Sequence, residues 1–305
     1  MPNILAVVVT YNRKNLLSNC LGALSSQTLK PDKILIIDNA STDGTEDFLK
    51  LTGWFDRKDI HYTLLEQNTG GAGGFAFGLQ SALALNADWV WMMDDDASPQ
   101  FDALEELMRV ATDSRNIYGS LAISGKETAW ETTLLDPPLG VVSQADEIPE
   151  YAEVRMLPLL GFLIHRELAN KIGTPDAGFF IAGDDAEYCV RASRAGAKII
   201  VASRSRIHHP KSVVFHINLL GNKISYLSLP PWKRYYDTRN RLLIARRHYG
   251  FRIFTQTIPG SLVRLFTVLL KEPQKLAQFK AVCAGLIDGL LGLRGKRHEK
   301  WGIKL

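Results

Sequence analysis

Four short apolar runs in the first hundred residues, each followed by a polar loop, are the feature that most constrains the fold. The runs are Ile4–Thr10, Lys33–Asp38, Ile60–Leu65 and Asp88–Met93, and helical patterns separate them. Continuous β-branched and apolar runs of this length are typical of buried strands. Strands that alternate with helices form a mostly parallel sheet flanked by helices. The sequence therefore predicts an α/β fold.

The polar loops that follow these strands are "TYNR", "DNASTDGT", "NTGGAGG" and "DDDAS". On open parallel sheets, ligands bind beyond the carboxyl ends of the strands. Because four polar loops are expected at one edge of one sheet, we expect a single binding site there.

The glycine-rich segment Gln67–Gly78 allows three interpretations. Gly71–Ala76 fits a relaxed dinucleotide fingerprint, G-x-G-x-x-A, which would indicate a dinucleotide-dependent oxidoreductase. In that fold, however, the first glycine follows the strand directly, whereas four residues intervene here. A helix packed closely on a sheet accounts for one or two glycines. The remaining interpretation is that Gly70 and Gly71 let the backbone approach a ligand.

Three consecutive acids, Asp94, Asp95 and Asp96, end the fourth predicted strand. Alternate side chains of an extended chain point the same way, so Asp94 and Asp96 can face one point and Asp95 another. Two carboxylates together with phosphate oxygens suit Mg²⁺ or Mn²⁺. The alternative is a helix start, since acids favour helix N-termini. One acid would be enough for that purpose, so the cluster favours a metal.

A second acidic group, Asp184, Asp185 and Glu187, opens a later helix. Acids at a helix N-terminus are stabilised there, and Glu187 can pair with Arg191 one turn on. An ionised aspartate at this place can also serve as a general base. Both interpretations remain open from the residues alone. The same holds for His208 and His209, because a histidine after a strand is usually a surface residue unless a metal lies nearby.

The C-terminal third differs in character. From Lys211 onward, basic residues far outnumber acidic ones, although the net charge of the whole chain is only +4. Pro259 and Arg264 interrupt its apolar stretch, so we expect no membrane-spanning helix. The pattern fits a basic amphipathic helix on anionic lipid, or equally a helical domain that closes the sheet or forms a homo-oligomer. Three widely separated cysteines indicate a reducing, cytoplasmic compartment, and we expect no nucleic-acid partner.

Taken in order, "VVVTYNR", "DNASTDGT", "NTGGAGGF", "MMDDDA", "GDDAEYCVR" and "RIHHPKS" resemble the family 2 glycosyltransferases. The resemblance covers roughly residues 2–212. It implies the GT-A nucleotide-sugar-binding fold, a divalent metal and inversion at the anomeric carbon. The "N-x-GG-x-GGF" element looks like that of bacterial galactofuranosyltransferases, which use UDP-galactofuranose. One departure is Gly183, where those enzymes usually have tryptophan, and this puts the acceptor in doubt.

The resemblance also implies roles for single residues. It makes Asp185 the catalytic base and places Asp184 and Glu187 at the acceptor. A metal, Mn²⁺ or Mg²⁺, would be held by Asp94, Asp96 and His209, with His208 as the fallback. The nucleotide-sugar site would comprise Thr10, Arg13, Asp38, Asn68, Gly70, Gly71, Asp94 and Asp95, with Asp38 accepting the uracil imide proton.

From these observations we expect a GT-A domain over residues 1–212 and a basic helical region over 213–305. The expected activity is transfer of galactofuranose to a lipid-linked polysaccharide acceptor at the cytoplasmic face of the inner membrane. A rhamnosyl- or other hexosyltransferase is the first alternative. A dinucleotide-dependent oxidoreductase and a catalytically silent sugar-nucleotide-binding module are more remote.

Overall fold

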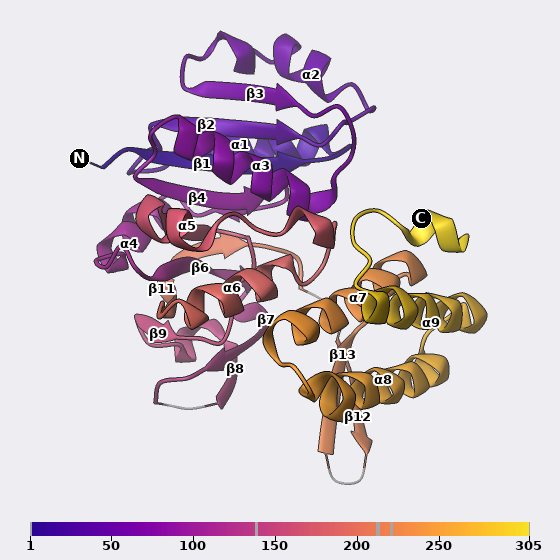
Figure 1. The fold of residues 1–305 in the computed structure, drawn as a ribbon. Helices are drawn as coiled ribbons and strands as arrows, with labels where there is room; N and C mark the ends of the chain where they lie inside the picture. The colour runs from indigo at the N-terminus through magenta and orange to yellow at the C-terminus, as the bar shows by residue number, and fades with distance from the viewer. Residues whose placement is uncertain (1, 138–139, 212–213, 220–221, 305) are drawn as a thin grey trace. The chain divides into compact units, whose positions relative to one another are not determined.

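The computed structural model describes residues 2–137, 140–211, 214–219 and 222–304. The chain divides into two compact units (Figure 1). Unit 1 comprises residues 1–176 and 185–211, and unit 2 comprises residues 177–184 and 212–305. The short segment 177–184 therefore groups with the C-terminal region, although it lies within residues 2–212, which resemble the glycosyltransferases.

Unit 1 is built on a mixed sheet whose main path runs β3-β2-β1-β4-β10-β6-β11-β5. The first four strands along this path are parallel, β10 runs antiparallel between β4 and β6, and β11 is parallel to β6. The described strands are β1 Ile4–Thr10, β2 Lys33–Asp38, β3 Ile60–Leu64, β4 Trp89–Asp94, β5 Ser98–Pro99, β6 Ile117–Ser124, β7 Glu127–Leu134, β8 Gly140–Gln144, β9 Tyr151–Glu153, β10 Phe162–His165 and β11 Ile199–His208.

Helices cover both faces of this sheet, as the α/β prediction requires. On one face, alternate β1 residues such as Val7 pack with α3 and α6, and on the other their neighbours such as Val8 pack with α1 and α4. β1, β2 and β4 are buried on both sides, which explains their continuous apolar runs in the sequence. The helices of this unit are α1 Lys14–Ser25, α2 Thr45–Leu51, α3 Gly70–Ala84, α4 Ala103–Val110, α5 Arg166–Ile172 and α6 Asp184–Arg194, with short 3-10 turns at Trp54–Asp56 and Ala145–Glu147.

The register of the parallel strands brings their polar loops together. Thr10 at the end of β1 pairs with Asp38 at the end of β2, and Asp94 at the end of β4 pairs with Val9. The carboxyl ends of β1, β2 and β4 thus meet at one sheet edge, as expected from the sequence.

The glycines of α3 have separate structural reasons. A Cβ on Gly74 or Gly78 would lie 2.5 or 2.4 Å from side-chain carbons of β1, so these two let the helix pack closely on the sheet. A Cβ on Gly73 would collide with Thr69. Gly70 has a φ of +74°, which glycine adopts without strain. A Cβ on Gly71 would meet nothing within 4 Å.

Unit 2 consists of helices and a β-hairpin that the sequence analysis did not foresee. The hairpin pairs β12 Val214–Leu219 with β13 Asn222–Leu227. The helical elements are η3 Ala177–Phe179, α7 Pro231–His248, the π-helical turn η4 Ile253–Thr257, α8 Ile258–Lys271, α9 Lys275–Leu291 and η5 His298–Trp301. Helices α7 and α9 approach closely because Gly285 and Gly289 of α9 lie against α7, where a Cβ would fall 2.7 and 2.8 Å from its atoms.

In the part of the chain that the structure describes, one helical segment, Ile253–Lys271, is long and apolar enough to cross a membrane by length and composition. We expected no such segment because of Pro259 and Arg264, yet the helix runs through both residues. A single helix of this kind is weak evidence for a span, since core helices of soluble proteins meet the same test.

Candidate functional site

The acidic cluster at the end of β4 alternates in burial, although β4 ends at Asp94 and the next two acids lie in a turn. Asp95 is buried, whereas Asp94 and Asp96 on either side are partly exposed. Asp95 Oδ2 accepts a hydrogen bond from the Thr10 hydroxyl at 2.7 Å, and Oδ1 accepts one from Arg13 at 3.2 Å. Asp95 is therefore the inward anchor of the cluster, and it ties the ends of β1 and β4 together.

Arg13 is shared between two of these acids. The same guanidinium nitrogen that contacts Asp95 donates to Asp96 Oδ2 at 3.0 Å. Burial alone would lower the pKa of Arg13, but the charges of Asp95 and Asp96 outweigh it and raise that pKa. Burial raises the pKa of Asp95, and the bonds from Thr10 and Arg13 only partly offset this effect. The cluster thus holds more negative charge than one arginine balances.

The second oxygen of Asp96 lacks a partner. Asp96 Oδ1 is buried without a hydrogen-bond partner among the described residues, and it lies 3.9 Å from Nε2 of His209. His209 Nδ1 lies 2.7 Å from the carbonyl oxygen of Pro210, which can only accept, so Nδ1 donates. In the neutral ring Nε2 then carries a lone pair, and 3.9 Å is too long for a hydrogen bond. Two electron-pair donors facing each other across this gap fit a cation.

The neighbouring histidine is directed elsewhere. His208 is exposed and lies 3.3 Å from the side-chain nitrogen of Gln100. β11 ends at His208, and in the residue after it the ring of His209 lies toward Asp96 while that of His208 lies toward Gln100. The ring of His209 also packs edge-on against Trp130 of β7, at 5.6 Å between ring centres. No group of three or more His, Cys, Asp or Glu in the described residues has the geometry of a metal site, so the place of Asp94 in such a set stays a prediction.

The loop after β2 is joined to the glycine segment by Asn39. Its amide nitrogen donates to the carbonyl oxygen of Gly70 at 2.7 Å, and its amide oxygen accepts from the Thr69 backbone at 2.8 Å. Asn68 Oδ1 accepts from the Gly70 N–H at 2.8 Å and so caps the start of α3. These bonds fix the backbone of Gly70 and Gly71 beside the end of β2.

Asp38 is buried at the same edge. One of its oxygens accepts from the backbone N–H of Ser41 and the other from the hydroxyl of Tyr62, each at 2.7 Å. Burial and this carboxylate raise the pKa of Tyr62. Asp38 thus shapes the loop that follows β2, and its expected bond to a uracil ring stays a prediction.

The acids of α6 have local roles. Asp185 Oδ1 accepts from the backbone N–H of Ala186 at 2.7 Å, at the start of the helix. Glu187 is fully buried and pairs with Arg191 at 2.7 Å, one turn on, as the spacing predicts. Arg191 in turn donates to the carbonyl oxygens of Ile172 and Thr174. Glu187 therefore anchors α6, and its contact with an acceptor, like those of Asp184 and Asp185, stays a prediction.

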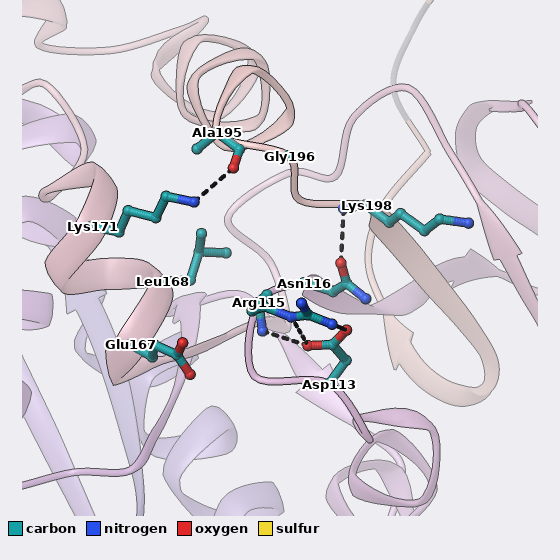
Figure 2. Close-up of a pocket in the computed structure, with 9 residues that line it drawn as sticks. All are labelled: Asp113, Arg115, Asn116, Glu167, Leu168, Lys171, Ala195, Gly196 and Lys198. Atoms are coloured by element: carbon teal, nitrogen blue, oxygen red, sulfur yellow. Dashed lines mark hydrogen bonds and ion pairs between the residues drawn. The ribbon is translucent and has the colours of Figure 1, made fainter.

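A pocket of about 460 Å³ lies elsewhere in unit 1 (Figure 2). It is lined by residues that precede β6 and β11, so it lies at the opposite edge from the strand-end loops. Its three cationic side chains are already held: Arg115 by Asp113, Lys171 by the carbonyl oxygen of Ala195, and Lys198 by Glu153. We assign the ligand site to the strand-end loops, where Asp96 Oδ1 is buried without a hydrogen-bond partner among the described residues.

Three residues of this edge, Asn39, Tyr62 and Trp130, were not singled out from the sequence. Asn39 stands within the quoted "DNASTDGT" loop, and asparagine in such a loop often bonds nearby backbone, so its signal was available. Tyr62 and Trp130 come from strands whose pairing with the site elements depends on the fold, and no local pattern marks them.

Comparisons with known proteins agree with this geometry. The family model "Glycosyl transferase family 2" matches residues 5–182. Galactofuranosyltransferase GlfT1 of Mycobacterium tuberculosis is 33% identical over 261 residues, which cover 78% of this chain and 81% of that protein. The dTDP-rhamnosyl transferase RfbF of Shigella flexneri is 22% identical and covers 96% of this chain and 97% of its own length.

Solved structures with the same fold include GalNAc-T7 with UDP, GalNAc and Mn²⁺, at a TM-score of 0.65 and 14% identity. That alignment covers 92% of this chain and 54% of the other, so this chain spans about half its length. The mannosyltransferase PcManGT from Pyrobaculum calidifontis, with GDP-Man and Mn²⁺, has a TM-score of 0.57 at 14% identity over 95% of this chain and 88% of the other. These likenesses show a GT-A fold, and the family match leaves no place for the oxidoreductase alternative. The chain belongs to glycosyl transferase family 2.

Proposed function

We propose that this protein transfers galactofuranose from UDP-galactofuranose to a hydroxyl group of a glycan acceptor, with inversion at the anomeric carbon. The observation that carries the proposal is the strand-end site, where the unpartnered Asp96 Oδ1 faces His209 at 3.9 Å in a family of nucleotide-sugar enzymes. The donor sugar is taken from the similarity to the mycobacterial galactofuranosyltransferase over most of both chains.

Mn²⁺ or Mg²⁺ fits the residues present, because Asp96 Oδ1 is a hard oxygen ligand and the imidazole nitrogen His209 Nε2 lies near it without a mutual hydrogen bond. Asp94 is the third ligand in this proposal. When bound, such a cation neutralises charge on the donor's diphosphate. Asp95 keeps Arg13 in place beside it, and the backbone of Gly70 and Gly71 borders the space for the donor.

Asp185 is the proposed general base. It takes the proton from the acceptor hydroxyl, whose oxygen forms a bond to the anomeric carbon on the face opposite the nucleotide. The bond from that carbon to the diphosphate oxygen breaks, and UDP leaves with its electron pair. The helix N-terminus favours the ionised carboxylate that this step needs.

A rhamnosyl donor is the second candidate. The observation that favours it is the match to the Shigella rhamnosyl transferase, which extends over 96% of this chain, more than the galactofuranosyl match covers. Turnover of UDP-galactofuranose compared with dTDP-rhamnose, each with the same acceptor mixture, separates the two. Exclusive use of dTDP-rhamnose would reject the galactofuranose proposal and leave the site assignments standing.

For the acceptor we propose a lipid-linked polysaccharide intermediate, met at the cytoplasmic face of the inner membrane. The basic C-terminal region supports this setting, since its charges suit an anionic leaflet.

The base assignment is tested by Asp185→Asn. Asparagine also caps helices, so stability should change little, but it cannot accept the acceptor's proton. We expect turnover to fall roughly a hundred- to ten-thousand-fold, with UDP and metal binding unchanged in calorimetry.

The matched control is Asp184→Asn, the same change one residue earlier, for which we expect a milder loss. An active Asp185→Asn together with an inactive Asp184→Asn would move the base by one residue. If both variants keep parental turnover, α6 is purely structural and the proposed mechanism is wrong.

A further inference from the structure

The outer surface of unit 2 carries large apolar side chains where a soluble helix usually carries polar ones. From the turn before η4 to the end of α8, a row of such side chains is between 51% and 75% exposed. Isolated exposed apolar residues are ordinary, but a contiguous row at helical spacing marks an interaction surface. We call these residues the α8 stripe: Phe251, Phe254, Leu262, Phe266 and Leu270.

The inner side of the same helical segment holds polar side chains beside the buried apolar residues Ile253 and Val268. Ser261 and Thr267 are buried, and their hydroxyls donate to the backbone carbonyls of Thr257 and Val263. Arg264 is half-buried, and burial followed by the charge of Arg241 lowers its pKa to about 10. A soluble amphipathic helix keeps polar groups in water and apolar ones in the core, whereas here the large apolar side chains are mostly exposed and several polar ones are buried. An apolar medium outside the stripe accounts for this arrangement.

The charges around the stripe identify that medium. Between residues 249 and 295 the acids are Glu272 and Asp288, and both are buried and paired with arginines. A second copy of this chain would bring like charges together at a symmetric contact, which is unfavourable. A surface with negative charge is favoured by the exposed charged side chains of this region, which are Arg252, Lys271, Lys275, Lys280 and Arg294.

We propose that the α8 stripe inserts into the headgroup–acyl boundary of an anionic bilayer, with α8 parallel to the membrane plane and the basic side chains on lipid phosphates. This inference deepens the membrane setting proposed above and does not depend on the donor sugar. The in-plane arrangement keeps Ser261, Arg264 and Thr267 in their protein contacts. A spanning arrangement of Ile253–Lys271 would instead carry Arg264 into the hydrocarbon, where a charge is costly.

The test is sedimentation of the full chain with vesicles of phosphatidylcholine, alone or mixed with phosphatidylglycerol. We expect binding to the anionic vesicles, weaker at high salt. Leu262→Gln with Phe266→Gln should weaken partitioning by at least roughly tenfold, because two inserted side chains lose their transfer free energy. The matched control, Leu51→Gln with Phe101→Gln, removes the same pair from unit 1, where these residues are 88% and 65% exposed, and should bind like the parent.

Orientation is read from nitroxide labels at Phe254→Cys, Leu262→Cys and Leu270→Cys in a Cys283→Ser background, since Cys20 and Cys189 are buried. In-plane insertion predicts one shallow depth for all three. A label at residue 262 that lies far deeper than the other two would show a spanning helix and overturn the proposal. So would an absence of vesicle binding, or a dimer that the stripe variant dissociates without any effect on vesicles. Turnover with a soluble acceptor is measured separately, so that failure of the enzyme proposal stays distinct from failure of this one.

A different observation in unit 2 carries a second inference. The loop that precedes α6 has positive φ at Phe180 (64°), Ala182 (68°) and Gly183 (80°). Residues with a side chain rarely adopt this region, and they persist in it only where the surroundings hold them.

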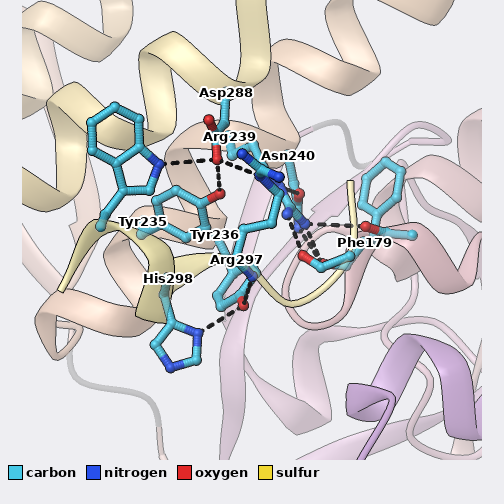
Figure 3. Close-up of polar contacts among 11 residues, drawn as sticks. Phe179, Tyr235, Tyr236, Arg239, Asn240, Asp288, Arg297 and His298 are labelled. Atoms are coloured by element: carbon cyan, nitrogen blue, oxygen red, sulfur yellow. Dashed lines mark hydrogen bonds and ion pairs between the residues drawn. The ribbon is translucent and has the colours of Figure 1, made fainter. Parts of the chain in front are cut away.

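Two buried residues of α7 hold this loop (Figure 3). The Asn240 amide nitrogen donates to the carbonyl oxygens of Phe179, Ile181 and Ala182, at 3.0, 2.9 and 2.6 Å. Arg239 donates to the carbonyl oxygen of Phe179 at 2.7 Å and to Asn240 Oδ1 at 2.8 Å. The second bond fixes which way the amide points, because Oδ1 must be the acceptor.

We infer that Arg239 and Asn240 are positioning residues, which fix the backbone from which Asp184 and Asp185 begin α6. This inference rests on the proposed role of Asp185 as the base. Asn240→Asp keeps the size and the bond from Arg239, but it replaces the donor by a carboxylate that faces three carbonyl oxygens. We expect kcat to fall more than roughly tenfold with the donor KM unchanged, since small displacements of a catalytic group are costly.

The control is Asp288→Asn, which weakens the same unit away from this loop and should leave kcat unchanged below its melting temperature. If Asn240→Asp does not fold, Arg239→Lys gives the same test, because lysine lacks the second donor. Parental kcat in Asn240→Asp, or in Arg239→Lys where the first variant does not fold, overturns the inference. An equal loss of kcat in Asp288→Asn also overturns it. An active Asp185→Asn would instead defeat the proposed base itself.

Discussion

Asp95 in unit 1 and Asp288 in unit 2 are both buried carboxylates, yet their surroundings shift their pKa values in opposite directions. Burial raises the pKa of Asp95, and its two protein donors do not offset this, partly because Asp96 lies beside it. Burial also opposes ionisation of Asp288, but the bonds from Arg297, Tyr235 and Trp301 outweigh it and lower the pKa. All three bonds end on one oxygen of Asp288, Oδ2, and Figure 3 shows the bond from Tyr235.

The difference separates a structural carboxylate from one that awaits a ligand. Asp288 joins α7, α9 and η5 within unit 2, and its charge is balanced on site. The strand-end cluster of unit 1 has a surplus of negative charge and a buried oxygen on Asp96 without a partner. A buried polar group without a partner costs stability, so proteins keep one mainly where function needs it.

The largest expected effect comes from changing the strand-end cluster of unit 1, the cluster that we expect to bind a ligand. Asp96→Asn should reduce turnover at least roughly a hundredfold, because it removes the oxygen that faces His209 and weakens the metal's charge stabilisation. The melting temperature should hold or rise, since one unbalanced charge is lost. Turnover assays with added Mn²⁺ and thermal denaturation measure the two outcomes.

The two histidines provide the matched control for this effect. His209→Ala should raise the Mn²⁺ concentration needed for half-maximal turnover, whereas His208→Ala should not, because His208 faces Gln100. Full activity of the parent in chelator would refute the metal assignment. Equal behaviour of the two histidine variants would refute the geometry drawn from His209.

Much of the fold could be predicted because it depends on local patterns. Apolar runs such as Ile4–Thr10 and Lys33–Asp38 are strands in the structure, and the polar loops after them meet at one edge. The hairpin of β12 and β13 was missed because the basic composition around it suggested helix throughout. The exposure of the apolar side chains of α8 could not be predicted either, since periodicity gives a helix two faces without saying which one is buried.

The site was predictable in residue type more than in detail. Alternation along an extended chain predicted that Asp95 faces away from Asp94 and Asp96, and the family resemblance favoured His209 over His208. The sequence did not reveal that Asn39 joins two loops or that Asn240 holds a third. These contacts depend on segments far apart in the chain, which only the tertiary structure brings together.

A smaller effect tests the structural side of the comparison. Asp288→Asn should lower the free energy of unfolding by about 2–4 kcal/mol, because three donors lose a buried, charged acceptor. Turnover measured well below the melting temperature should stay at the parental level. The acid-to-amide control Glu46→Gln, at an exposed ion pair with Lys50, should change stability little. A stable Asp288→Asn would show that the network adds nothing beyond packing.

The same carboxylate predicts a pH dependence. Since the pKa of Asp288 is lower in the folded state than the ordinary value of 3.8, its contribution is present above that value. The contribution is lost as the pH falls through the folded pKa. Below about pH 4, the parent should therefore lose stability faster than Asp288→Asn, and the two denaturation midpoints should converge. Midpoints that stay a constant interval apart down to low pH would contradict the shift.

The smallest expected effect concerns packing. It compares a helix glycine of unit 1 with a helix glycine of unit 2. In α9, a Cβ on Gly285 would lie 2.7 Å from the Tyr235 carbonyl oxygen, and backbone cannot move aside as a flexible side chain can. In α1, a Cβ on Gly22 would meet nothing within 4 Å. Alanine favours a helix over glycine by about 1 kcal/mol, while overpacking costs about 1–3 kcal/mol. We therefore expect Gly22→Ala to stabilise the protein and Gly285→Ala to destabilise it, by up to about 2 kcal/mol once the helix gain is subtracted. Denaturant unfolding of the two variants measures both signs. If Gly285→Ala stabilised the protein as Gly22→Ala does, α7 and α9 would not pack as closely as this structure has them. The bonds of Asp288, which join these two helices, would then not form as described.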